Sequence, residues 1–232
     1  MFTDLPIIVT GAAGNVGGAA ARLLAERGAR VAAVDMVKDR LEAAVAALPH
    51  AERHLACAGV DLLDPAACAA LVARVTASFG GLYGVVTTVG GFAMAPLDQT
   101  GLADWDRMFA LNVKTTWAIY QAAVPALRAR GGGALVGVGS VAGLKGGAQM
   151  APYAATKAAV LRLTESLADE LRSEHIRVNA VMPTTIDTPQ NRAAMPDADT
   201  TRWVTPEQVA ETMLFLLSGA ASGVTGQLVQ VG

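Results

Sequence analysis

Short apolar runs alternate with longer amphipathic segments along the whole chain. Runs rich in Val, Ile and Ala predict seven buried β-strands, at 6–10, 31–35, 54–59, 84–88, 134–139, 176–182 and 227–231. The amphipathic segments predict helices at 15–27, 38–48, 65–78, 102–130, 152–173 and 206–218. Strands that alternate with helices form right-handed crossovers, so the strands run parallel between two helical layers. The pattern predicts one doubly wound α/β domain over residues 1–232, with a seven-stranded parallel sheet.

The composition predicts a large apolar core and a weakly charged surface. Hydrophobic residues make up 53% of the chain and charged residues 16%. Chains this apolar often bury further surface between subunits, so we expect a homo-oligomer, either a tetramer or a dimer. The net charge is −2 and no basic run is present, which argues against a nucleic-acid partner.

Other compositional signals exclude several protein classes. Residues 75–97 carry no charge, but glycines and Pro96 interrupt them, which favours a buried strand with turns over a membrane span. The N-terminus lacks the basic flank of a signal peptide, so we expect a cytoplasmic protein without a membrane partner. Cys57 and Cys68 form no redox motif and are interpreted as core residues, and the three histidines predict no metal site.

The first predicted strand ends in a glycine-rich turn, which includes Gly11, Gly14 and Gly17 and precedes a helix. Glycines there let the backbone approach a pyrophosphate, which the free N–H groups of the helix stabilise. Asp35 ends the second strand, 18 residues after Gly17, where its carboxylate would bind ribose hydroxyls and repel a 2′-phosphate. These features indicate a Rossmann-type site for NAD (NADH), favoured over NADP. Asp61 would meet the adenine edge or, alternatively, begin the helix at Pro65.

Tyr153, Lys157 and Ser140 carry the candidate chemistry. Positions i and i+4 share one helix face, so the Lys157 ammonium can lie beside the Tyr153 phenol. A nearby positive charge favours the phenolate and draws the phenol's pKa down toward neutrality. The pair is therefore a candidate general acid/base at a carbonyl or alcohol oxygen.

Taken in order, these motifs resemble the short-chain dehydrogenase/reductase family over essentially the whole chain. The other matching motifs are Asp61-Leu62, Asn112 in Leu-Asn-Val-Lys, and Asn179 to Pro183 followed by Thr188. The resemblance implies a catalytic tetrad of Asn112, Ser140, Tyr153 and Lys157, in which Ser140 orients the substrate oxygen and Asn112 holds a helix kink and a water. The alternatives are that Ser140 caps a turn and that Asn112 is a satisfied buried amide. The resemblance also implies cofactor contacts from Gly11, Gly14, Asn15, Val16, Gly17, Asp35, Asp61, Leu62, Gly90, Tyr153, Lys157, Pro183, Thr184, Ile186 and Thr188.

The chain departs from the family pattern at four places. The glycine spacing is that of the family's extended branch, whereas the length fits the short branch. Thr87-Thr88-Val89-Gly90 replaces the usual Asn-Asn-Ala-Gly, and Pro183-Thr184 replaces Pro-Gly. The Asp-Gly-Gly tail that often follows the last strand is absent from the sequence.

The substrate should lie beyond the carboxyl ends of the strands, under a short lid at about 184–205. The candidate wall residues are Phe92, Met94, Leu144, Met150, Met195 and Trp203, which would form an apolar pocket or, alternatively, pack the lid onto the core. Residues 187–206 are also similar to the lid of quinonoid dihydropteridine reductases, although those enzymes generally lack the serine found here at Ser140.

The leading hypothesis is an NAD-dependent oxidoreductase that acts on a small or medium apolar alcohol or ketone. A pterin reductase is the alternative enzyme. A regulatory protein that binds NAD without turnover is the alternative of another class, and the presence of both Tyr153 and Lys157 argues against it.

Overall fold

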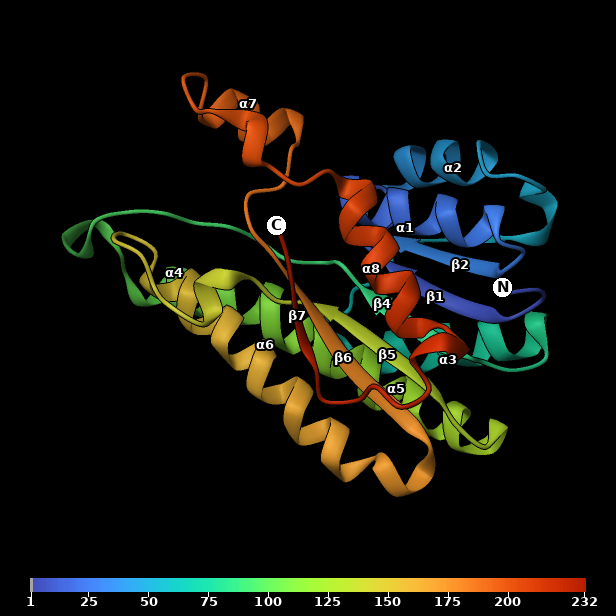
Figure 1. Cartoon of the computed structure of the whole chain (residues 1–232). Coiled ribbons are helices and arrows are strands. Elements are labelled where there is room, and N and C mark those ends of the chain that lie inside the picture. The colour runs from blue at the N-terminus through green and yellow to red at the C-terminus, as the bar shows by residue number, and fades with distance from the viewer. Residues whose placement is uncertain (1) are drawn as a thin grey trace.

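The computed structural model describes residues 2–232, which form a seven-stranded parallel sheet between two layers of helices (Figure 1). The strand order is β3-β2-β1-β4-β5-β6-β7. The strands are β1 (Pro6–Thr10), β2 (Arg30–Asp35), β3 (Leu55–Ala58), β4 (Gly84–Thr87), β5 (Gly133–Val138), β6 (Ile176–Pro183) and β7 (Leu228–Val231). This is the predicted doubly wound fold, and the predicted strands are confirmed with shifts of one or two residues at their ends.

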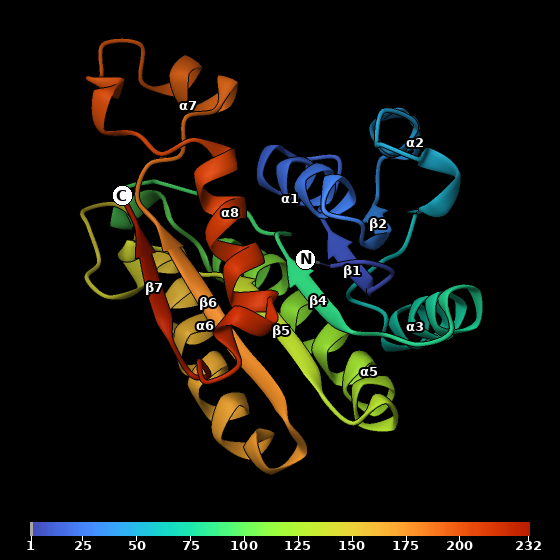
Figure 2. The ribbon, with the colours of Figure 1, turned by 45° about the vertical axis from the view of Figure 1, so that its right-hand side comes forward.

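Two apolar cores lie on opposite faces of the sheet because its strands are buried on both sides. One core packs under α1 (Asn15–Glu26), α2 (Lys38–Ala46) and α8 (Pro206–Leu217). The other packs under α3 (Pro65–Phe79), α5 (Thr115–Arg130) and α6 (Ala151–Glu170). Figure 2 shows the two helical layers on either side of the strands. Cys57 and Cys68 belong to the second core, as the composition predicted.

The helix predicted over 102–130 is divided. It consists of α4 (Leu102–Phe109), a π-helical turn (Ala110–Lys114) and α5. Asn112 is at the centre of the turn and is 1% exposed. A π-turn inserts one extra residue into a helix and changes which side chains face the neighbouring elements.

The lid contains a helix that the apolar pattern did not predict, α7 (Pro189–Ala194). Its first turn is capped by the Thr188 hydroxyl, which accepts a hydrogen bond from the Asn191 N–H at 3.1 Å. The base of the lid closes through a parallel bridge between Ile186 and Val204. Figures 1 and 2 place α7 beyond the carboxyl ends of the strands, apart from the helical layers. Within residues 2–232, no helix combines the length and apolar character that crossing a bilayer requires.

Candidate active site

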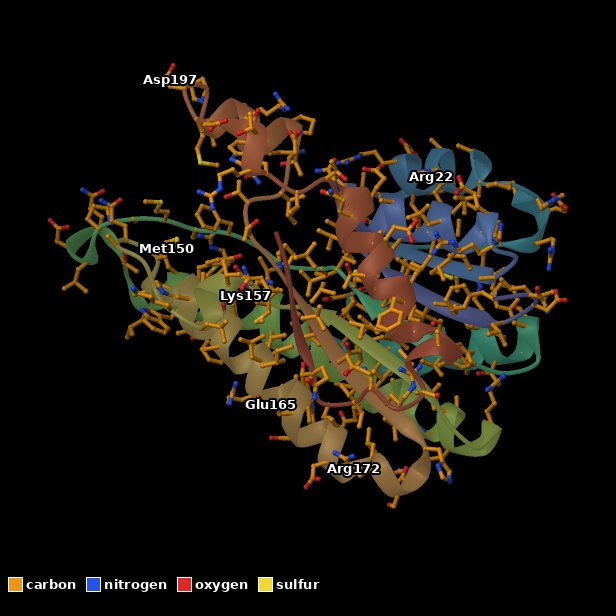
Figure 3. The ribbon with its side chains drawn as sticks, viewed as in Figure 1. Arg22, Met150, Lys157, Glu165, Arg172 and Asp197 are labelled. Carbon is orange, nitrogen blue, oxygen red and sulfur yellow. The ribbon has the colours of Figure 1, made fainter. Side chains whose placement is uncertain are left out.

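The loops that follow β4, β5 and β6 converge on one cavity of about 230 Å³ at the carboxyl edge of the sheet. Ser140 comes from the end of β5, and Tyr153 and Lys157 come from the first turns of α6. All three line this cavity. Other predicted site residues in its lining are Val16, Gly90, Phe92, Pro183, Thr184 and Ile186. Figure 3 shows Lys157 near this edge, whereas Glu165 lies farther along α6 and Arg172 lies just beyond its end.

Lys157 is the buried cation of the site. Its side chain is 6% exposed, and its Nζ donates a hydrogen bond to the Val138 carbonyl at 2.9 Å. Burial lowers the pKa of the ammonium to about 8, because a charge is less stable away from water. The Nζ lies 5.9 Å from the centre of the Tyr153 ring, as the shared helix face predicted.

The pKa of Tyr153 moves in the direction opposite to the prediction. Burial raises the pKa of the phenol, and a hydrogen bond with Ser140 opposes that rise only in part. The Lys157 ammonium bonds instead to the Val138 carbonyl. Because its pKa is raised, the Tyr153 phenol keeps its proton at neutral pH.

Ser140 both caps a turn and faces the cavity. It precedes a single 3₁₀ turn, Val141–Gly143, and its Oγ accepts a hydrogen bond from the Ala142 N–H at 3.2 Å. Because this bond uses Oγ as an acceptor, the hydroxyl hydrogen is left to donate toward Tyr153 or a substrate oxygen. The two interpretations of Ser140 are compatible.

Asn112 contacts α6 without lining the cavity. Its Oδ1 accepts a hydrogen bond from the Gly91 N–H at 2.8 Å, and its Nδ2 donates to the Gly91 carbonyl at 3.1 Å. The same Nδ2 donates to Thr156 Oγ1 at 3.0 Å. The side chain is thus a satisfied buried amide at the centre of the π-turn, and its role in holding a helix kink and a water stays a prediction.

A second cavity, of about 320 Å³, lies at the nucleotide end of the site. Its predicted members are Gly11, Gly14, Asp35, Asp61, Leu62 and Gly90. Thr88 and Gly90 line both cavities, so the two are neighbours along the carboxyl edge.

The glycine turn fits a dinucleotide. A Cβ on Gly17 would lie 2.1 Å from the Gly11 carbonyl oxygen, so only glycine allows α1 to start this close to β1. Gly14 lines the nucleotide cavity and Val16 lines the catalytic cavity, so the N-terminus of α1 lies between the two. The free N–H groups of a helix N-terminus there would suit a pyrophosphate.

Asp35 lies where a ribose-binding carboxylate is expected. It accepts hydrogen bonds from the Ala13 and Val37 N–H groups, both at 3.1 Å. Arg40, which the sequence analysis did not identify, donates to the Ala13 carbonyl at 2.9 Å. The sequence carried one signal for Arg40, namely its position in the first turn of the helix that follows Asp35. From there its guanidinium reaches back to the glycine turn.

Asp61 lines the nucleotide cavity, three residues beyond the end of β3. Its Oδ1 accepts a hydrogen bond from the Leu63 N–H at 2.8 Å. The cap of α3 is instead Asp64, whose Oδ1 accepts from the Ala66 N–H at 2.8 Å. The alternative role proposed for Asp61, at the start of this helix, therefore belongs to Asp64.

Thr88, in the altered motif after β4, makes a contact that stabilises the sheet. Its hydroxyl donates to the Thr10 carbonyl at 2.7 Å and thereby ties β4 to the end of β1. The preceding Thr87 pairs its hydroxyl with that of Tyr120 at 3.3 Å. Both hydroxyls thus bond to neighbouring elements.

Of the six predicted wall residues, only Phe92 belongs to the lining of the catalytic cavity. Its ring packs edge-to-face against Tyr153, with centroids 4.9 Å apart and planes at 77°. The other five, Met94, Leu144, Met150, Met195 and Trp203, lie outside that lining. Met195 and Trp203 belong to the lid, which projects away from the sheet, and Figure 3 marks its tip at Asp197.

Three predicted cofactor residues, Asn15, Gly17 and Thr188, lie outside both cavities. Asn15, at the start of α1, is exposed, and its Nδ2 donates to Gln190 Oε1 on α7 at 3.0 Å. Thr188 is the cap of α7. Asn15 and Gln190 therefore join the glycine turn to the lid. Among residues 2–232 no group of three His, Cys, Asp or Glu side chains could hold a metal ion.

Comparisons with known proteins identify the family of the chain. The family model for short chain dehydrogenases matches residues 6–199. The chain is 37% identical over 239 residues to a cis-4-hydroxycyclohexanecarboxylate dehydrogenase of Sinomonas cyclohexanicum, covering 99% of this chain and 96% of that protein.

Two solved structures share the whole fold. One is an NAD⁺-bound xylitol dehydrogenase, with a TM-score of 0.91 and 26% identity, covering 99% of this chain and 98% of that one. The other is a 7α-hydroxysteroid dehydrogenase in complex with NADH and 7-oxo glycochenodeoxycholic acid, with a TM-score of 0.89 and 28% identity, covering 99% and 93%.

The chain belongs to the short-chain dehydrogenase/reductase family. It is an oxidoreductase of that type, and the family uses nicotinamide cofactors. The similarity of its lid to dihydropteridine reductases stays a prediction.

Proposed function

We propose that this protein is an NAD(H)-dependent oxidoreductase that interconverts a small or medium apolar alcohol and its ketone, with Tyr153 as the general acid/base. One observation carries the proposal: Ser140, Tyr153 and Lys157 line a single cavity that adjoins the cavity of Asp35. The proposed cofactor residues fit a dinucleotide, with the glycine turn at the pyrophosphate and Asp35 at the adenosine ribose. The bound nicotinamide would supply or accept the hydride.

The proton chemistry falls to residues of the chain itself. Ser140 donates its hydroxyl hydrogen to the substrate oxygen and fixes its position in the cavity. Tyr153 gives that oxygen a proton during ketone reduction and takes it back during alcohol oxidation. Lys157 holds its charge beneath the ring, which stabilises the phenolate that remains after reduction.

The wall next to Tyr153 supports an apolar substrate. Phe92 contributes an aromatic ring, and Val16, Val138 and Ile186 contribute aliphatic groups to the same cavity. Lys157 is the only Lys or Arg in that lining, and it bonds to Val138. A secondary alcohol on a compact hydrocarbon frame suits this combination.

The test is a panel of cyclic and linear secondary alcohols and ketones, followed through the absorbance of NADH. We expect turnover by the unmodified protein and a loss of at least about 100-fold in Tyr153→Phe, because a general acid/base contributes roughly that factor. Equal turnover by Tyr153→Phe would refute the role of the phenol.

The proposed choice of NAD over NADP rests on the Asp35 carboxylate and has its own test. We expect a lower KM for NADH than for NADPH, and a smaller ratio between them in Asp35→Asn, which removes the charge that repels a 2′-phosphate. Arg40 is the neighbouring cation that would favour a phosphate, so Arg40→Gln is the matched comparison. Equal use of NADH and NADPH by the unmodified protein would overturn the proposal.

A further inference from the structure

Thr156 lies between two parts of the active site that come from different elements. It directly precedes Lys157 on α6, and its side chain is fully buried. Its Oγ1 accepts a hydrogen bond from Asn112 Nδ2 at 3.0 Å and donates one to the Tyr153 carbonyl at 2.8 Å. The hydroxyl thus uses both its acceptor and its donor capacity.

The amide of Asn112 extends this connection to the loop after β4. Two hydrogen bonds join it to the N–H and the carbonyl of Gly91, at 2.8 and 3.1 Å. The amide nitrogen carries two hydrogens, and its acceptors are the Gly91 carbonyl, Thr156 Oγ1 and, at 4.0 Å, Met108 Sδ. Because Asn112 is buried and a thioether is a weak acceptor, the loss of Gly91 or Thr156 as a partner would leave a polar hydrogen poorly satisfied, with no water to replace it.

The same loop reaches the ring of the candidate catalytic tyrosine. Phe92 follows Gly91 and packs edge-to-face on Tyr153, with 4.9 Å between the ring centroids. Thr156 therefore contacts the backbone of Tyr153, and Phe92 contacts its ring. Thr156 is hydrogen-bonded to Asn112 directly, and Phe92 is connected to Asn112 through its neighbour Gly91.

We infer that Thr156 is a positioning residue, which, together with Asn112, holds the Tyr153 phenol in register with the β4 loop and hence with the substrate. The inference rests on the proposed acid/base role of Tyr153. It requires a hydroxyl at position 156, because only a group that both donates and accepts can join an amide N–H to a carbonyl oxygen. A shift of about 1 Å in a catalytic group lowers turnover by roughly 100-fold, so a small hydroxyl can have a large effect.

Two pairs of variants isolate the hydroxyl. Thr156→Val keeps the shape and removes the hydroxyl, and Thr156→Ala and Thr156→Ser differ from each other only in the hydroxyl. Thr164→Val is the control, because Thr164 is on the same helix, is 3% exposed and donates its hydroxyl only to the Val160 carbonyl, at 2.9 Å.

The expected result is a selective loss of kcat. We expect Thr156→Val and Thr156→Ala to lower kcat by about 10- to 100-fold with the KM for NADH within about twofold of the unmodified value. Thr156→Ser should recover most of the kcat, and Thr164→Val should retain all of it. The inference is overturned if Thr156→Val keeps the kcat of the unmodified protein and only lowers the melting temperature, as Thr164→Val does. It is also overturned if the kcat of Thr156→Ser is no higher than that of Thr156→Ala.

A spectroscopic readout separates this inference from the proposed function. With ¹³C-labelled tyrosine, the protein gives ring signals for Tyr83, Tyr120 and Tyr153, and Tyr153→Phe identifies the last of them. We expect Thr156→Val to shift and broaden the Tyr153 signal while leaving the other two in place, and Thr164→Val to move none. If no substrate of the panel is turned over but this signal moves, the proposed function fails and the positioning role stands. An unmoved signal refutes the positioning role whether or not turnover is found.

Discussion

At the scale of single residues, Lys157 shows how the site opposes the stability of the fold. Burial lowers the pKa of its ammonium to about 8 from the ordinary value of 10.5. The unfolded chain therefore holds this proton more tightly than the folded chain does. By linkage the residue destabilises the protein fully below pH 8, and the destabilisation disappears as the pH rises toward 10.5.

Lys157→Met should accordingly produce a more stable and inactive protein. Methionine fills a similar volume without a charge, so we expect the free energy of unfolding at pH 7 to rise by about 2–3 kcal/mol. The gain should shrink between pH 8 and 10.5. Urea unfolding at several pH values measures it, with Lys38→Met as the control because that side chain is 69% exposed. A gain in the free energy of unfolding that does not depend on pH would show that the buried charge of Lys157 is not the cause of the destabilisation.

Gly90 leaves little room for a side chain beside Asn112 and Lys157. A Cβ at this position would lie 2.7 Å from Asn112 Oδ1 and 3.6 Å from Lys157 Nζ. We expect Gly90→Ala to lower the free energy of unfolding by about 1–3 kcal/mol through overpacking, and to reduce turnover because Asn112 must shift. Gly219→Ala, at a position with no atom within 4 Å, should change neither quantity. Equal melting temperatures for the two alanine variants would show that Asn112 moves freely.

At the scale of elements, the sequence predicted the strands and the main helices because their apolar periodicity is strong. It did not predict the π-turn between α4 and α5. The apolar pattern of 102–130 is continuous, and the extra residue of the turn is accompanied by bonds from Asn112 to Gly91 and Thr156, which are distant in the sequence. Helix α7 had visible signals in Thr188 and Pro189, but its six residues are too few to show a period.

The same reasoning explains which site residues could be found. The spacing of Tyr153, Lys157 and Ser140 is local, so the sequence was sufficient to place all three in one site. Thr156 acts through a hydrogen bond to Asn112 on another element, which no spacing reveals. Arg40 had only its position after Asp35 as a signal, and its bond to Ala13 is seen only in the structure. The wall residues were chosen from loops by their apolar character alone, and loop conformation is not encoded by such a pattern.

The lid and the glycine turn are joined by side chains of two helices. Gln190 on α7 accepts the hydrogen bond of Asn15 on α1, next to the proposed pyrophosphate site. We expect Gln190→Ala to raise the dissociation constant of NADH by about 2- to 10-fold, because one exposed hydrogen bond contributes roughly 0.5–1.5 kcal/mol. Tryptophan fluorescence during NADH titration measures this constant. Gln121→Ala, at an exposed position of α5, is the control, and equal constants for the two variants would exclude a role for the lid contact.

At the scale of the whole molecule, the surface near α4 and α5 carries apolar side chains that a single copy leaves exposed. Leu97 is 90% exposed, Leu102 is 82% exposed and Trp117 is 44% exposed. Exposed apolar residues in consecutive segments are typical of surfaces that bind another protein. Together with the high apolar content, they support the proposed homo-oligomer.

Light scattering tests this proposal directly. We expect the mass of a dimer or a tetramer for the unmodified protein and a smaller mass for Leu102→Lys, because a buried unpaired charge opposes association. Ala70→Lys introduces the same charge at an exposed position of α3 and should leave the mass unchanged. A monomeric unmodified protein would refute the oligomer.

The nucleotide end and the substrate end of the active site differ in how tightly their residues are packed. This difference affects how new substrate preferences arise. At the nucleotide end, the glycine turn is fixed by close packing, because Gly11 and Gly17 tolerate no side chain. The substrate end presents Phe92, which is 60% exposed and therefore little constrained by packing. Substitutions at Phe92 can change which substrates enter the cavity with little loss of stability. Substitutions in the glycine turn disrupt the packing and are removed by selection. Relatives with a common nicotinamide half can therefore diverge rapidly in the alcohols they accept.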